Sequence, residues 1–377
     1  MKSREQMVES LTHAGIALRG PRDPFEGSTV RINDNRTWSQ VALWGTRGLA
    51  RAYENGWWDC ERPDVVVEKA VQHGLDSKLF SSSLSDLALK IRAALFNLQS
   101  RARAFVVGEK HYNAGNTLFE TMLGKHPLYS CAYWSGTPRA QTLDDAQEAK
   151  LHLICRKLKL KRGDHILDIG CGFGELLRFA HEHYGVTGVG ITISKEQAKF
   201  ARKLVHGLPI EIWEVDYRDL QTSRKFDREV SVGMFEHVGQ KNHRAFFEMA
   251  QRHLKQDGLF LLHTITGSGE ADPFLNDDIF PGSVVPSLKQ VERSAQQRFK
   301  RLDLHEFGRD YDPTCCEWEK NLSHGWTRIA HLYNNDEKFL RRWRLYLLMS
   351  AGLFRAGKTS VAQFVLSNCD FSYDPVR

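Results

Sequence analysis

The ten residues His165-Ile166-Leu167-Asp168-Ile169-Gly170-Cys171-Gly172-Phe173-Gly174 specify the architecture of the chain. An apolar run that ends in an acid and alternating glycines predicts a short buried strand, a tight turn and the start of a helix. Such a turn brings free backbone N–H groups and the positive end of a helix dipole to one point. We therefore expect a negatively charged or nucleotide-like ligand there. The alternative is an ordinary tight turn that joins a strand to a helix.

The spacing of the glycines narrows the class of ligand. A dinucleotide-binding loop has a third glycine that lets the helix pack closely on the strand, but Glu175 or Leu177 stands there, depending on the register. A phosphate-binding loop is excluded because neither Lys-Ser nor Lys-Thr follows the glycines. The remaining form, an acid followed by Gly170, Gly172 and Gly174, resembles the first motif of the S-adenosylmethionine-dependent methyltransferases. In that family the glycines let the methionine moiety approach the backbone closely.

Helix and strand patterns alternate from about residue 147 onward, which predicts an α/β fold whose parallel sheet is covered on both faces. Strands are expected at 165–170, 186–192, 210–215, 227–232 and 259–264, with two late strands near 301–307 and 363–367. Helices are expected at 147–160, 175–184, 195–204 and 242–254. We predict a seven-stranded doubly wound methyltransferase fold over residues 109–377. A smaller, mostly helical domain is expected at 1–94, with a linker at 95–108.

Composition restricts the environment of the protein. No apolar run approaches the roughly 20 residues that span a bilayer, and the first residues form no signal-peptide core, so we expect a cytoplasmic protein. The seven cysteines are odd in number and contain no C-x-x-C pair, which predicts reduced thiols and no metal site. The net charge of +6 is mild. Basic clusters at 156–162, 298–301 and 341–344 suit either an anionic membrane surface or solvated helix faces.

Several further segments make a resemblance specific. Besides the glycine loop, they are found in order at 56–59 (Gly-Trp-Trp-Asp), 111–119, 129–134, 235–239, 261–265 and 310–312. Over almost its whole length the chain resembles the cyclopropane-fatty-acyl-phospholipid synthases and the mycolic acid cyclopropane synthases. The resemblance implies that a methyl group passes from S-adenosylmethionine to a cis double bond of a phospholipid acyl chain. A proton is then removed so that the ring closes, and a bound bicarbonate ion takes it.

The resemblance also implies roles for individual residues. Those implied to bind bicarbonate are Cys131, Glu236, His263, Ile265 (through its backbone) and Tyr311. Those implied to bind the cofactor are Tyr129, Ser130, Gly170, Gly172, Gly174, Thr192, Gln197, Asp216 and Tyr217, while Asp168 is expected to organise the glycine loop. An aromatic pocket of Tyr133, Trp134 and Phe235 is expected to stabilise the carbocation through the ring faces. The alternative for these three rings is core packing.

The chain departs from the family pattern at three places. Phe173 and Glu175 stand where relatives commonly have Trp and Gly, and His126 stands where they have Asp before the proline. Glu175 suits the first turn of a helix but is expected to add negative charge near the cofactor's carboxylate and so to weaken cofactor affinity. Trp57 and Trp58 face either a lipid interface or the protein interior, and we favour the interior.

Three other functions remain open. A small-molecule methyltransferase explains every motif except the bicarbonate residues, and a noncatalytic lipid-binding protein also shares the fold. A nucleic-acid methyltransferase would need a stronger basic footprint and an Asn-Pro-Pro-aromatic segment after the fourth strand, where Phe235-Glu236-His237 stands instead. The expected partner is therefore membrane phospholipid with unsaturated acyl chains, met by peripheral contact at the inner face of the membrane, and not nucleic acid. A homodimer is compatible with the sequence, which does not specify the oligomeric state.

Overall fold

The computed structural model describes residues 3–76, 115–268, 272–370 and 372–377, which form two units. Of these residues, the first unit contains 3–76, 272–281 and Tyr311–Thr359. The second contains 115–268, Gly282–Asp310 and Ser360–Arg377 without residue 371. The expected boundary at 94 and the expected linker at 95–108 lie outside the described residues. Within the described ranges, none of the helices combines the length and the apolarity needed to cross a bilayer.

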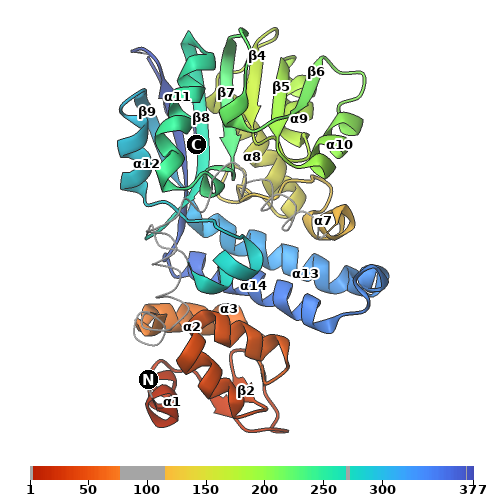
Figure 1. Ribbon diagram of the computed structural model, residues 1–377, viewed down its shortest axis with the longest axis vertical. Coiled ribbons are helices and arrows are strands. Elements are labelled where there is room, and N and C mark those ends of the chain that lie inside the picture. The colour runs from red at the N-terminus through yellow and green to blue at the C-terminus, as the bar shows by residue number, and fades with distance from the viewer. Residues whose placement is uncertain (1–2, 77–114, 269–271, 371) are drawn as a thin grey trace. The chain divides into compact units, whose positions relative to one another are not determined.

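The second unit is built on a seven-stranded sheet, as the sequence predicts. Its strands are β4 (His165–Ile169), β5 (Thr187–Thr192), β6 (Ile210–Glu214), β7 (Phe226–Val232), β8 (Leu254–Thr266), β9 (Lys300–Glu306) and β10 (Ser360–Ser367). Their order is β6-β5-β4-β7-β8-β10-β9 (Figure 1). The pairs from β6 to β8 are parallel, whereas β10 runs antiparallel to both β8 and β9. The last strand of the chain is therefore inserted between two earlier ones.

Helices cover both faces of this sheet, which confirms the doubly wound α/β fold. Helices α8 (Leu143–Lys157), α9 (Glu175–Tyr184) and α10 (Lys195–Leu204) pack into one core cluster, and α11 (His243–His253) and α12 (Leu288–Ala295) pack into another. Helix α7 (Asn116–Leu123) precedes them in the chain. Side-chain caps explain several starts, since Thr142 forms a capping box with Asp145 and Ser194 accepts from the Gln197 N–H. The predicted helix 195–204 matches α10 at both ends.

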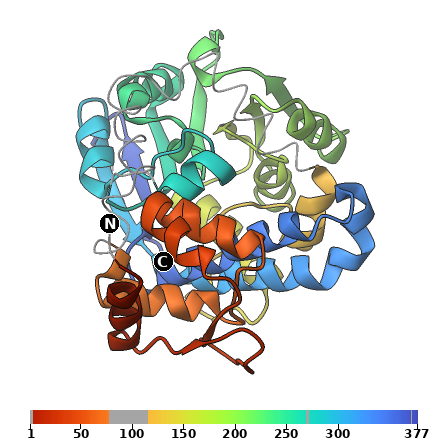
Figure 2. The same cartoon turned by 60° about the horizontal axis from the view of Figure 1, so that its bottom comes forward.

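The first unit joins the N-terminal residues to two helices from late in the chain. It contains α1 (Arg4–His13), β1 (Leu18–Arg19), β2 (Val30–Ile32), α2 (Arg36–Glu54), β3 (Trp58–Asp59), α3 (Pro63–Gln72), α13 (Tyr311–Ile329) and α14 (Glu337–Arg355). Helix α14 packs against α13, α3 and α2, and both views show α13 and α14 side by side (Figures 1 and 2). This division differs from the expected one, in which all residues after 109 belong to the catalytic domain.

Buried ion pairs explain why the late helices join the N-terminal residues. Arg355 of α14 donates to Asp64 at 2.8 Å and to Asp312 at 2.6 Å, and its third partner is Glu68 at 3.3 Å. The Asp64 side chain is fully buried, so it needs these donors to remain ionised. Burial raises the pKa of Asp64, but the bonds from Arg62 and Arg355 outweigh it and hold that pKa below its usual range.

The basic cluster at 341–344 and the aromatic pair at 57–58 face other parts of the same unit. Arg341 pairs with Asp59, Arg342 with Glu54 and Arg344 with Glu319. These arginines are therefore occupied by carboxylates of their own unit. The indole N–H of Trp58 donates to the Leu49 carbonyl at 3.0 Å, and its side chain is buried, whereas Trp57 is half-buried under the Arg36 guanidinium at 4.2 Å. The preference for packing is confirmed for Trp58.

Candidate active site

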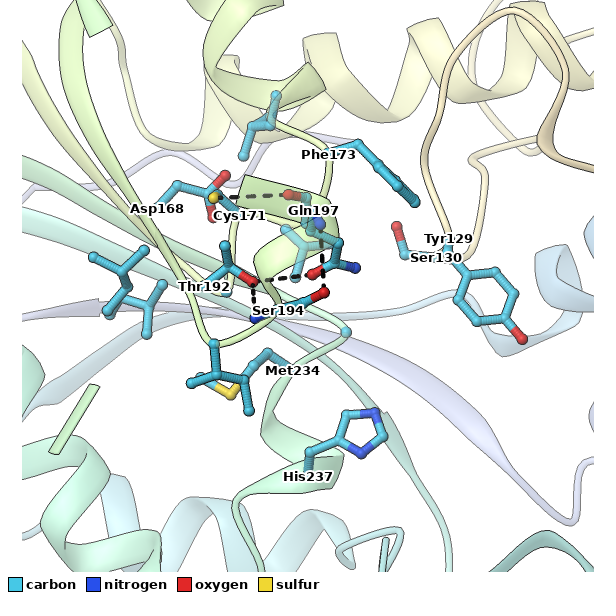
Figure 3. Close-up of a pocket in the computed structure, with 18 of the residues that line it drawn as sticks. Tyr129, Ser130, Asp168, Cys171, Phe173, Thr192, Ser194, Gln197, Met234 and His237 are labelled. Atoms are coloured by element: carbon cyan, nitrogen blue, oxygen red, sulfur yellow. Dashed lines mark hydrogen bonds between the residues drawn. The ribbon is translucent and has the colours of Figure 1, made fainter. Parts of the chain in front are cut away.

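A cavity opens where β4, β5, β6 and β7 end, which is where open α/β sheets bind their ligands. Its wall comes from the glycine loop after β4 and from the residues that follow the other three strands. Asp168 lines it together with eight of the nine residues implied to bind the cofactor: Tyr129, Ser130, Gly170, Gly172, Thr192, Gln197, Asp216 and Tyr217. Figure 3 shows Tyr129 and Ser130 on the opposite side of the view from Asp168 and Thr192. Gly174 is not part of this wall.

The glycines have two different functions in the loop. Gly170 has φ +86°, and a Cβ atom there would lie 2.6 Å from Cγ of Met234, which also lines the cavity. Gly174 has φ +84° and directly precedes α9, and a Cβ atom there would lie 3.0 Å from the Ala201 Cβ on α10. The first glycine therefore lets Met234 pack directly on the loop, while the last permits close packing of two helices. Both functions require the absence of a side chain.

A small hydrogen-bond network follows β5, at residues that the resemblance implies to bind the cofactor. The Thr192 hydroxyl donates to Gln197 Oε1 at 3.0 Å and accepts from the Ser194 N–H at 3.2 Å (Figure 3). The Gln197 backbone N–H in turn donates to the Ser194 hydroxyl. Because these three side chains orient one another, they present fixed polar groups to the cavity.

Two carboxylates of the cavity wall differ in their charge balance. Both Asp216 oxygens accept from the Arg218 guanidinium, at 2.8 and 2.5 Å, so this acid is already neutralised by a partner. Asp168 is 2% exposed, and burial raises its pKa to about 7. A side chain that is partly protonated at neutral pH can both donate and accept hydrogen bonds. Asp168 and Asp216 therefore offer a ligand different chemistry.

Glu236 lies in the short helical turn (Phe235–His237) that follows β7, and its side chain reaches the backbone of β8. Its Oε1 accepts from the Ile265 N–H at 2.6 Å, while its Oε2 is buried with no partner among the described residues. Burial raises the pKa of Glu236 to about 7 against the opposing effect of the backbone N–H groups. The Ile265 N–H thus orients the Glu236 carboxylate, and the role of the Ile265 backbone at bicarbonate stays a prediction.

His263 lies on the same strand, two residues before Ile265. Its Nδ1 lies 3.2 Å from the amide nitrogen of Gln363, its register partner on β10, and its Nε2 is buried with no partner among the described residues. Burial, reinforced by the charges of Lys150 and Lys157, holds the pKa of His263 well below its usual range, so the ring is neutral. If the amide donates to Nδ1, the proton resides on Nε2. β8 thus carries an orphan ring nitrogen on His263, two residues before the N–H that binds Glu236, whose Oε2 is an orphan acceptor.

Aromatic side chains connect this edge to the segment at 129–134. The rings of Tyr133 and Phe307 meet edge to face at 5.3 Å, and Phe307 meets the His263 ring at 5.6 Å. The Trp134 backbone N–H donates to Asp310 Oδ2 at 2.7 Å, which anchors the segment next to Cys131. Cys131 itself is fully buried. Phe307 contacts two expected site residues, Tyr133 and His263, and the sequence analysis missed it because it stands at the end of an expected strand without a motif.

Two further expected site residues lie among packed aromatic side chains. Phe235 is fully buried in the core cluster, with its ring 5.1 Å from Phe246 and 5.5 Å from Phe247, which agrees with the packing alternative, and its role toward a carbocation stays a prediction. Tyr311 belongs to the first unit as the first residue of α13, where its ring packs on Phe354 at 4.5 Å. Its role at bicarbonate stays a prediction.

The two polar departures from the family pattern form a pair. His126 Nδ1 lies 2.7 Å from Glu175 Oε1, and Arg178 binds both Glu175 oxygens at 2.7 and 2.8 Å. Glu175 is 2% exposed and is not part of the cavity wall. Burial raises its pKa, but the bonds to Arg178 and His126 keep that pKa below its usual range. The expected negative charge near the cofactor is therefore compensated, and the reason for expecting weak affinity is removed.

Several other residues of the cavity wall were not identified from the sequence. Lys150, Cys171, Met234, His237 and Arg218 all line the cavity. Burial lowers the pKa of His237 to about 4, so this ring is neutral at physiological pH. The signal for His237 was present, because it stands inside the 235–239 motif. Nothing in the sequence distinguished Lys150 from the other polar residues of its helix.

Comparisons with known proteins agree with this geometry. The chain matches the family model described as mycolic acid cyclopropane synthetase over residues 99–364. It is 43% identical over 365 residues to the cyclopropane-fatty-acyl-phospholipid synthase of Escherichia coli, covering 95% of this chain and 92% of that protein. It is 33% identical over 281 residues to cyclopropane mycolic acid synthase 1 of Mycobacterium tuberculosis, covering 68% of this chain and 94% of that one.

Solved structures show the same relationship. The mycolic acid cyclopropane synthase CmaA1, crystallised with SAH and CTAB, superposes with a TM-score of 0.65 at 32% identity, over 70% of this chain and 97% of that one. The cyclopropane synthase MmaA2 from Mycobacterium tuberculosis gives a TM-score of 0.64 at 32% identity over the same shares. The chain therefore belongs to the mycolic acid cyclopropane synthetase family of S-adenosylmethionine-dependent transferases.

Proposed function

We propose that this protein transfers a methylene unit from S-adenosylmethionine to the cis double bond of an unsaturated acyl chain in a membrane phospholipid. The product is a cyclopropane fatty acyl phospholipid. The proposal depends above all on one observation: Glu236 Oε2 and His263 Nε2 are both buried without a partner among the described residues, and Glu236 binds the backbone N–H two residues after His263. The extent of the similarity supports phospholipid as the substrate. The cyclopropane-fatty-acyl-phospholipid synthase of Escherichia coli matches 95% of this chain, whereas cyclopropane mycolic acid synthase 1 of Mycobacterium tuberculosis matches 68%.

The first step joins the methyl carbon to an alkene carbon. When bound, S-adenosylmethionine supplies an electrophilic methyl group on a positively charged sulfur. The π electrons form the new C–C bond, the C–S bond breaks, and sulfur keeps its electron pair. An alkene is a poor nucleophile, so the protein must align the two carbons and exclude water, and such positioning contributes several kcal/mol. The buried aromatic contacts among Tyr133, Phe307 and His263 supply a dry wall at this place.

The second step removes a proton from the carbocation. The electrons of the broken C–H bond close the three-membered ring, and bound bicarbonate supplies the base. Bicarbonate carries oxygens that accept hydrogen bonds and a hydroxyl that donates one. Glu236 Oε2 can accept that hydroxyl when it is ionised, and His263 can donate through Nε2. The residues present therefore fit this ion, with Ile265 orienting Glu236 and the Cys131 N–H as a further predicted donor.

The location of the substrate implies further proposals. Because the acyl chains lie within a bilayer, the protein must make peripheral contact with the cytoplasmic face of a membrane. The arginines at 341, 342 and 344 are paired within the protein, so other surface groups have to provide that contact. A homodimer remains part of the proposal and is tested by measuring the mass of the protein in solution.

The test is mass analysis of phospholipids incubated with the purified protein, in vesicles whose acyl chains have one cis double bond. Cyclopropanation adds one CH2 and leaves a product that resists ozonolysis, whereas a methyl-branched alkene has the same added mass but is cleaved. Vesicles with fully saturated chains are the matched control. A cleaved product would indicate a different C-methyltransferase, and no product with SAH still bound would favour a noncatalytic lipid-binding protein.

A further inference from the structure

Helix α8 buries a lysine at the cavity that the proposed chemistry does not use. Lys150 is 0% exposed and lines the cavity, and its ammonium donates to the Ser130 hydroxyl at 2.7 Å. An ammonium has three N–H donors, and this is the single hydrogen bond that Lys150 makes with the described residues. The remaining donors therefore have capacity for a ligand in the cavity.

A second side chain of α8 holds the same segment in place. The amide nitrogen of Gln147 lies 3.2 Å from the Ser130 carbonyl and 3.3 Å from the Leu128 carbonyl, and it donates to both. The amide oxygen of Gln147 is buried without a partner among the described residues. The position of the Ser130 hydroxyl is thus set from both its backbone and its side chain. The contact between Lys150 and Ser130 is therefore fixed by surrounding hydrogen bonds.

Lys150 forms no ion pair with the described residues, in contrast to the other cation of the cavity wall, and the carboxylate whose charge acts on it, Glu175, is itself bound by Arg178. Arg218 is held by Asp216, but no carboxylate of the described residues forms an ion pair with Lys150. Burial lowers the pKa of Lys150 to about 7. A buried charge is costly unless an opposite charge accompanies it, so an anion that entered the cavity would be favoured at this point.

We propose that Lys150 and Ser130 together bind a carboxylate-type anion in this cavity. Two sources have this chemistry: the amino-acid carboxylate of the cofactor and free bicarbonate. The glycine loop lines the same cavity, which suits the first source. Ser130 directly precedes Cys131, whose N–H is a predicted donor to bicarbonate, which suits the second. This inference rests on the proposed function and adds a cation to its binding residues.

The test measures binding and needs no turnover. Lys150→Met removes the ammonium and keeps the apolar stem. Lys157→Met is the matched control, because Lys157 is also fully buried on α8 but pairs with Asp303 at 3.3 Å outside the cavity wall. Calorimetry with SAH reports the cofactor carboxylate, a SAH analogue without its carboxylate is the reference, and 13C-bicarbonate titrated by NMR reports the free ion.

We expect Lys150→Met to weaken one of these ligands by roughly 10–100-fold, since a hydrogen bond to a charged group is lost. Loss for SAH but not for its decarboxylated analogue assigns the cofactor carboxylate, and loss for bicarbonate alone assigns the free ion. Unchanged binding of both ligands, or an equal loss in Lys157→Met, would overturn the proposal. If Lys150→Met fails to fold, Ser130→Ala must weaken the same ligand severalfold. If the protein bound the anion through Lys150 but did not turn over lipid, the proposed function would be refuted and the role of Lys150 would stand.

Discussion

Glu236→Gln tests the proposed proton-transfer site most directly. The amide oxygen of glutamine can still accept from the Ile265 N–H, so the 2.6 Å bond that positions the side chain is retained. The Oε2 atom, which is buried without a partner among the described residues, becomes an NH2 group that donates. The substitution therefore removes the negative acceptor and leaves its position unchanged.

The expected loss follows from the bond that disappears. A hydrogen bond to a charged group contributes about 1.5–3 kcal/mol, and 1.4 kcal/mol corresponds to a factor of ten, so turnover should fall roughly 10–150-fold. SAH affinity should stay within about twofold, because Glu236 is not part of the cavity wall. Glu229→Gln is the matched control, since Glu229 is an equally buried carboxyl group on β7 to which no role is assigned.

The pH profile provides a second measurement of the same group. Burial raises the pKa of Glu236 to about 7, and the acceptor must be ionised, so wild-type turnover should rise as pH increases through this value. The glutamine variant should lack that rise. Because the raised pKa makes the ionised wild type less stable at higher pH, the variant should lose no stability at alkaline pH. Wild-type turnover in Glu236→Gln, or a profile that keeps its rise near neutral pH, would remove Glu236 from the mechanism.

Three further predictions address the loop, the core and the paired departures. Gly170→Ala should weaken SAH binding by tenfold or more in calorimetry, because its Cβ atom would lie 2.6 Å from Met234 Cγ and positive φ costs roughly 1–2 kcal/mol; unchanged affinity contradicts this. Burial raises the pKa of Glu229 well above its usual value, so the free energy of unfolding of the wild type should fall as pH rises above about 4.5. Glu229→Gln should not show this fall, and urea unfolding at pH 5.5 and 8.5 measures the difference. The same change in unfolding free energy between the two pH values in both proteins would refute this prediction. His126→Ala should destabilise the fold by roughly 1–3 kcal/mol, because it removes the 2.7 Å bond to buried Glu175, and an unchanged melting temperature would refute it.

The regular part of the fold was accessible from local patterns. The predicted helices at 175–184 and 195–204 match α9 and α10 at both ends, because a glycine and a serine cap mark their starts. The strands from β4 to β7 match within one residue at each end. Periodicity and caps act over a few residues, and a single sequence contains them completely. The same holds for the glycine loop, whose spacing resembles the first motif of the S-adenosylmethionine-dependent methyltransferases.

The partners of charged side chains were not accessible in this way. Glu175 was expected to repel the cofactor, yet it is bound by His126, 49 residues earlier in the chain. Phe235 stands in a motif but packs into the core. Whether a buried polar group is paired depends on which distant segments meet it, and spacing along the chain carries no such information.

The sequence was enough to establish the alternation of helices and strands, the glycine turn and the family. Each of these depends on short segments whose residues are neighbours in the chain. Only the folded chain established that β10 enters between β8 and β9, that residues 311–359 join the N-terminal unit, and that Lys150 faces the cavity without a carboxylate among the described residues. These features depend on contacts between segments far apart in sequence. Their energies come from burial and charge compensation, which exist only once the chain has folded.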